Sequence, residues 1–100
     1  MTRADDPCTA TRLPARRSDD GAIVIDARGT FCPVPILEAA KVVARCEAVG
    51  EEAWRVEVLA DDPDAPEDFA DWAAARGASA VAVELGKTQR PAWRLTLTPR

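Results

Sequence analysis

The turn between residues 26 and 35 constrains the fold of this 100-residue chain more than any other segment. Before it, Ile23-Val24-Ile25 is a β-branched run typical of a strand, and after it apolar residues recur with helical spacing. Pro33 and Pro35 fit the first turn of that helix, because the backbone N–H groups there have no intrahelical partner. The sequence therefore predicts a strand, a turn and a helix, with Cys32 at the helix N-cap.

The predicted position of Cys32 favours a reactive thiol. The thiolate is the nucleophilic form of cysteine, and a helix N-terminus presents unpaired N–H groups and a partial positive charge to it. We expect the backbone amides of Val34 and Ile36 to face the sulfur. Free cysteines also pack in cores as small hydrophobes, so the local chemistry leaves a structural cysteine open as well.

The helix after the turn is predicted over residues 33–48. Its buried arc comprises Ile36, Leu37, Ala39, Ala40, Val43, Ala44 and Cys46. Glu38, Lys41 and Arg45 share the opposite face, and Cys46 is interpreted as core packing.

The remaining elements alternate in type along the chain. A strand is predicted over 54–60 and a turn over 61–64, with Asp64 capping a helix whose buried residues are Phe69, Trp72 and Ala73 and which ends at Gly77. Strands over 81–85 and 93–97 follow and pair antiparallel across a short loop. Right-handed crossovers then place both helices on one face of the sheet. This predicts an α/β two-layer sandwich, β-α-β-α-β-β, with a mixed four-stranded sheet.

Residues 1–20 are rich in Pro, Thr, Ser, Arg and Asp. We expect them to form a flexible N-terminal tail ahead of a domain over residues 21–100, since such a composition buries little apolar surface. Cys8 would then be either an incidental exposed thiol or a resolving thiol for Cys32.

The composition excludes several classes of function. Histidine is absent, and the three cysteines are odd in number and widely spaced, so neither a metal site nor a disulfide framework nor a cofactor is predicted. The net charge of −4 argues against direct nucleic-acid binding. No apolar run reaches the roughly 20 residues of a membrane helix, and no signal peptide is recognisable, so we expect a cytoplasmic protein without membrane contact.

The run Asp26-Ala27-Arg28-Gly29-Thr30-Phe31-Cys32-Pro33-Val34-Pro35, followed later by Ala60-Asp61-Asp62-Pro63, resembles the TusA/SirA-like sulfurtransferase family. The hallmark of that family is a Cys-Pro-x-Pro motif after the first strand, with a glycine three residues before the cysteine. The resemblance covers residues 22–98 and implies a mixed four-stranded sheet with two helices on one side. Thr30 and the segment 76–79 depart from the family pattern.

The resemblance implies that Cys32 accepts a sulfane sulfur from a cysteine desulfurase or rhodanese-like donor and passes it to the cysteine of an acceptor protein. The pathway would be tRNA thiolation, molybdenum cofactor synthesis or sulfur metabolism, and the chain would act as a monomer. The supporting residues of the motif would be Arg28, Gly29, Pro33, Pro35, Asp62 and Pro63.

If the first two strands are parallel neighbours, Cys32 lies near the turn at 61–63. Carboxylates there would disfavour a thiolate, whereas Arg28 and the helix N-terminus would favour it. Two alternatives remain open: a regulatory or RNA-binding module, and a thiol redox protein in which Cys8 resolves Cys32.

Overall fold

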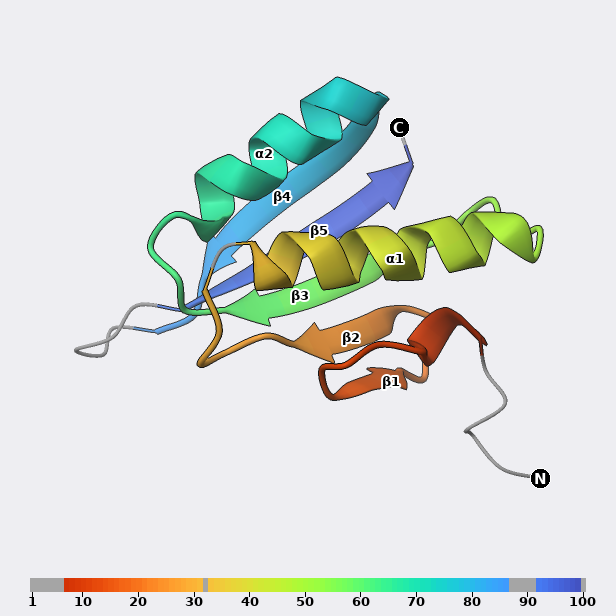
Figure 1. Ribbon diagram of the computed structural model, residues 1–100, viewed down its shortest axis with the longest axis horizontal. Helices are drawn as coiled ribbons and strands as arrows, with labels where there is room; N and C mark the ends of the chain where they lie inside the picture. The colour runs from red at the N-terminus through yellow and green to blue at the C-terminus, as the bar shows by residue number, and fades with distance from the viewer. Residues whose placement is uncertain (1–6, 32, 87–91, 100) are drawn as a thin grey trace.

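The computed structural model describes residues 7–31, 33–86 and 92–99. In chain order its elements are η2 (Pro7–Thr9), β1 (Ala15–Arg17), β2 (Ile23–Asp26), α1 (Val34–Ala48), β3 (Val56–Ala60), α2 (Ala65–Arg76), β4 (Ala78–Glu84) and β5 (Trp93–Pro99). Both helices cover the same face of a single sheet (Figure 1). The predicted two-layer α/β architecture is confirmed. No helix among these residues is long and apolar enough to cross a membrane.

The sheet is mixed and has five strands in the order β1-β2-β3-β5-β4. β2 and β3 are parallel, with Ile23 opposite Val56, and the other neighbours are antiparallel. Four of the strands are those predicted. The fifth, β1, adds an edge strand that the sequence analysis did not anticipate.

Residues 8–20, which the sequence analysis assigned to a flexible tail, pack against the domain in the structure. Ala15 pairs with Ile25 in the sheet, and Cys8 is 1% exposed. The segment is held by backbone pairing, by polar contacts and by the packing of Cys8, Leu13 and Ala15 on the core. The tail was inferred from the low content of apolar residues, and such contacts cannot be predicted from composition.

One of those contacts reverses the predicted orientation of Glu38. This side chain was assigned to the solvent face of the first helix, yet it is 4% exposed. The Thr11 hydroxyl and the Arg12 backbone N–H both donate to Glu38 Oε1, at 2.7 and 3.1 Å. The N-terminal segment therefore covers Glu38, whereas Lys41 and Arg45 on the same face are exposed as expected.

The core lies between the helices and the sheet. Its largest buried side chains are Phe69, Ile23, Ile25, Leu95, Leu97, Val42, Val43, Val56 and Val58. Cys46 is fully buried, as expected. Gly77 ends α2 in the left-handed region at φ 72°, a conformation that glycine adopts readily.

The larger apolar side chains of β4 point away from the core. Val81 and Val83 are exposed, whereas Ala78 and Ala80 pack against the core. Small side chains on the inner face of β4 fit beneath α2, with which β4 makes close contact.

Candidate functional site

The loop between β2 and α1 presents an apolar surface. Cys32 itself lies outside the described residues, so the site is defined by its neighbours. Phe31, Val34 and Leu37 follow one another at three-residue intervals and are 60%, 38% and 52% exposed. We call these three side chains the apolar rim. Phe31 is therefore not a core residue.

The two prolines of the motif take different roles at the start of α1. The N-cap residue is Pro33, and not Cys32 as was predicted, because the helix begins one residue later than expected. Pro33 is exposed, whereas Pro35 lies in the first helical turn and is buried. Pro35 lines a narrow space together with Ile36, Asp62, Ala65, Asp68 and Phe69. It thus fixes the N-terminus of α1 against the N-terminus of α2.

Gly29 joins this loop to the turn after β3. Its φ of 85° lies in the left-handed region, which disfavours a side chain. Its backbone N–H donates to Asp61 Oδ1 at 3.0 Å. Because β2 and β3 are parallel neighbours, the turns that follow them meet at one edge of the sheet, as expected. Asp61 was not among the predicted site residues, and only the strand pairing could have indicated its role.

Asp62 shapes the beginning of α2. It is 5% exposed, its Oδ1 accepts the backbone N–H of Asp64 at 3.0 Å, and its C=O accepts the N–H of Ala65 at 2.9 Å. Asp64 occupies the N-cap position but makes no side-chain capping bond. The exposed Pro63 lies between these two aspartates. The turn is therefore held by Asp62, where Asp64 was expected to provide the cap.

Arg28 is paired within its own loop. Its Nε and Nη2 donate to the two carboxylate oxygens of Asp26 at 2.9 and 2.8 Å. These hydrogen bonds lower the pKa of Asp26 from its usual value. Since the guanidinium and the carboxylate offset each other, Arg28 offers little net positive charge to a nearby thiolate.

The backbone at the start of α1 differs from expectation at one amide. The Val34 N–H donates to the carbonyl oxygen of Phe31 at 2.9 Å. This amide is therefore used within the loop and is not the free donor that was expected. The helix N-terminus still carries its partial positive charge, which favours an anion in the first turn.

Cys8 lies far from this loop. Its Sγ, the Sγ of Cys46 and a carboxylate oxygen of Glu51 all lie within 4.8 Å of one another. Cys46 is about 18 Å along α1 from Val34, at about 1.5 Å per residue. Because Cys8 sits at the opposite end of α1 from Pro33, the interpretation of Cys8 as a resolving thiol for Cys32 is wrong in this fold.

Replacing Asp61 by alanine is expected to loosen the loop before Cys32. The variant loses the acceptor of the Gly29 N–H, at a cost of about 1 kcal/mol in the free energy of unfolding. Amide exchange at Gly29 should accelerate, whereas Asp71→Ala, an exposed position on α2, should leave it unchanged. Equal exchange in both variants would show that Asp61 does not hold the loop.

Comparison with known proteins identifies the family of this chain. The model of the family described as sulfurtransferase TusA matches residues 23–98. The chain therefore belongs to the TusA sulfurtransferase family.

Two individual proteins show the same similarity. A protein of Archaeoglobus fulgidus, described as "Putative sulfur carrier protein", is 36% identical over 75 residues, which is 75% of this chain and 93% of that protein. The crystal structure of a SirA-like protein from Desulfitobacterium hafniense superposes with a TM-score of 0.56 at 26% identity, covering 77% of this chain and 97% of that one.

Proposed function

We propose that this protein is a sulfur carrier in which Cys32 receives a persulfide sulfur and passes it to another protein. The observation that carries the proposal is the family match over residues 23–98, which includes the Cys-Pro-x-Pro motif between β2 and α1. Gly29, Asp61 and Pro35 support the proposal because they fix both sides of the motif loop to the turn after β3 and to α2.

The chemistry needs no cofactor and no net oxidation. The Cys32 thiolate attacks the outer sulfur of a donor persulfide, a new S–S bond forms, and the donor leaves as a thiolate. Cys32 then carries one extra sulfur. In the second step an acceptor thiolate attacks that outer sulfur, and Cys32 leaves as a thiolate. Each step exchanges one S–S bond for another, so catalysis depends on thiolate character and access.

The partners in this proposal are proteins. The donor is a cysteine desulfurase or a rhodanese-like enzyme, and the acceptor is the next cysteine protein of a relay serving tRNA thiolation, molybdenum cofactor synthesis or sulfur metabolism. The apolar rim supports docking of a protein surface beside Cys32, because exposed apolar side chains that cluster mark interaction sites. The protein acts in this scheme as a monomer between two partners.

Sulfur loading tests the proposal directly. The reduced protein is incubated with a cysteine desulfurase and cysteine, or with a rhodanese and thiosulfate, and its intact mass is measured. A gain of one sulfur, reversed by reductant and retained in the Cys8→Ser/Cys46→Ser double variant, is the expected result. Failure to gain sulfur from either donor would contradict the proposal.

A further inference from the structure

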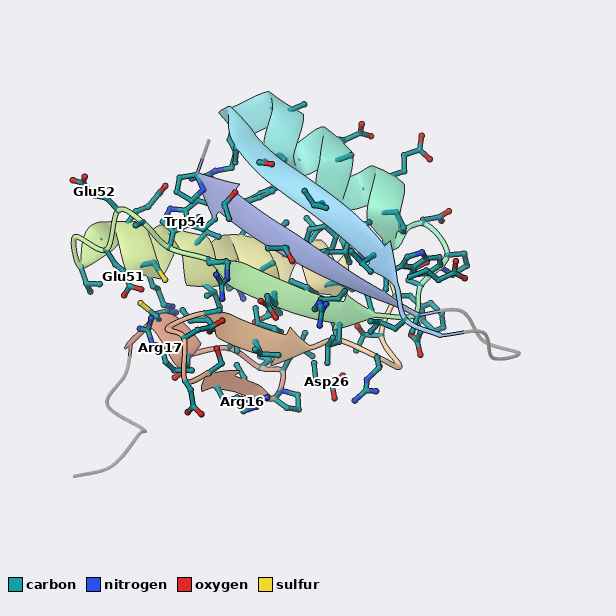
Figure 2. All side chains as sticks on the ribbon, turned by 180° about the vertical axis from the view of Figure 1, so that it is seen from behind. Arg16, Arg17, Asp26, Glu51, Glu52 and Trp54 are labelled. Atoms are coloured by element: carbon teal, nitrogen blue, oxygen red, sulfur yellow. The ribbon has the colours of Figure 1, made fainter. Side chains whose placement is uncertain are left out.

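A cluster of two cysteines and one glutamate lies at the C-terminal end of α1, away from the motif loop. Cys8 comes from η2, Cys46 from the last turns of α1, and Glu51 from the turn that follows. Both cysteines are buried thiols. In Figure 2 Glu51 and Arg17 lie close together at this end of the helix. The sequence spacing of the cysteines argues against a metal site, but the fold brings residues 38 positions apart in the chain into one cluster.

The separations in this cluster approach those of a metal coordination shell. The three ligand atoms lie within 4.8 Å of one another, and Cys8 Sγ is 3.6 Å from Glu51 Oε1. Zinc binds sulfur at about 2.3 Å and carboxylate oxygen at about 2.0–2.2 Å, so the ligand atoms of a tetrahedral site are about 3.6–3.8 Å apart. A contraction of at most about 1 Å in the longest separation reaches that geometry.

The backbone fixes two of the three ligands relative to each other. The Glu51 N–H donates to the carbonyl of Cys46 at 2.9 Å, and the Gly50 N–H donates to the carbonyl of Glu47 at 3.1 Å. With Gly50 at φ 85°, these bonds form a Schellman motif. The motif turns the chain back so that the Glu51 side chain meets Cys46.

Arg17 orients the carboxylate. Its Nη1 donates to Glu51 Oε2 at 2.7 Å and to the carbonyl of Gly21 at 3.0 Å. Its Nη2 donates to Oε1 at 3.2 Å, and Oε1 also accepts a hydrogen bond from Cys8 Sγ. A ligating carboxylate is commonly held in this way by a second hydrogen-bonded group. Arg17 can therefore remain on Oε2 while Oε1 binds an ion.

We propose that Cys8, Cys46 and Glu51 bind a thiophilic divalent cation, Zn²⁺. On binding, the two S–H bonds break and two protons pass to solvent, while two Zn–S bonds and one Zn–O bond form, with water in the fourth position. No group is oxidised or reduced. Two thiolates and one carboxylate, balanced by Zn²⁺ and the Arg17 guanidinium, give a neutral cluster. Paired thiolates select zinc over the hard cations Mg²⁺ and Ca²⁺, which prefer oxygen ligands.

The ion would fasten the N-terminal segment to the end of α1. To test this, the full-length reduced protein is stripped with a chelator, supplied with Zn²⁺ and desalted. We expect about one zinc ion per chain and a higher Tm with zinc than without, because a ligand bound only by the folded state stabilises it. Co²⁺ should give a thiolate-to-metal charge-transfer absorption.

Matched variants locate the site. Cys8→Ser and Cys46→Ala should lower zinc affinity at least about 100-fold, and Arg17→Gln about 10–100-fold. If a cysteine variant fails to fold, Glu51→Gln replaces it, because glutamine keeps the shape of the glutamate side chain. Glu51→Gln should weaken the cobalt absorption. Cys32→Ser should leave stoichiometry and absorption unchanged. Loss of zinc in Cys32→Ser, unchanged affinity in the other variants, or no zinc in the wild type would overturn the proposal.

Discussion

Replacing Cys32 by serine is expected to abolish sulfur loading. The other two thiols are poor substitutes, because Cys8 and Cys46 are 1% and 0% exposed. Burial, and next the neighbouring Cys8, raise the pKa of Cys46, so that without a bound metal its sulfur stays protonated. A buried thiol reacts only after local opening that costs a few kcal/mol, and each 1.4 kcal/mol lowers the rate about tenfold. Loading of Cys32→Ser should therefore fall by at least about 100-fold.

The rate of alkylation under native conditions provides the matching control. One thiol of the wild type should react rapidly, and that phase should be missing in Cys32→Ser and present in Cys8→Ser/Cys46→Ser. An unchanged circular dichroism spectrum would show that each variant is folded. Sulfur loading that persisted in Cys32→Ser would contradict the assignment of Cys32 as the carrier thiol.

Replacing Glu38 by alanine is expected to lower the free energy of unfolding by about 2–3 kcal/mol. The substitution removes the charged acceptor of the Thr11 hydroxyl and the Arg12 N–H, and hydrogen bonds to charged groups contribute more than neutral ones. It also removes the partner of Lys41 Nζ, which lies 3.1 Å from Oε2. Urea unfolding measures the loss, and Glu52→Ala, an exposed position in a turn, is the matched control.

The same contacts predict an acid dependence of stability. Hydrogen bonds from Thr11 and then Arg12, with a smaller effect of Lys41, lower the pKa of Glu38 from 4.5 to about 2. Because the folded pKa lies below the unfolded one, this carboxylate contributes its full stability above pH 4.5 and loses it as the pH falls toward 2. Glu38→Gln should show a shallower loss over this window. An acid profile identical to that of the wild type would contradict this role of Glu38.

The sequence predicted the elements that carry strong periodic signals. The β-branched run at 23–25, the prolines at the helix start and Gly77 at a helix end report local chemistry, and the structure has a strand, a helix start and a helix end there. The family motif is also a local signal, and the family membership that it implied is confirmed.

The features that sequence reasoning missed depend on contacts between distant segments. Helical periodicity predicts Glu38 as a surface residue of an amphipathic helix, but Thr11 and Arg12 cover it in the structure. Asp61 was predicted to lie in a solvated turn, but the parallel pairing of β2 and β3 brings Gly29 to it. Cys8 reads as part of a tail until β1 pairs with β2. Composition and periodicity do not encode such contacts.

The measurement that tests the central claim most directly is the position of the added sulfur. Loaded wild-type protein is alkylated, digested and mapped by mass spectrometry. We predict that the alkylated persulfide is found on the peptide containing Cys32, and that Cys8 and Cys46 carry none. Persulfide on Cys8 or Cys46, with Cys32 unmodified, would contradict the account.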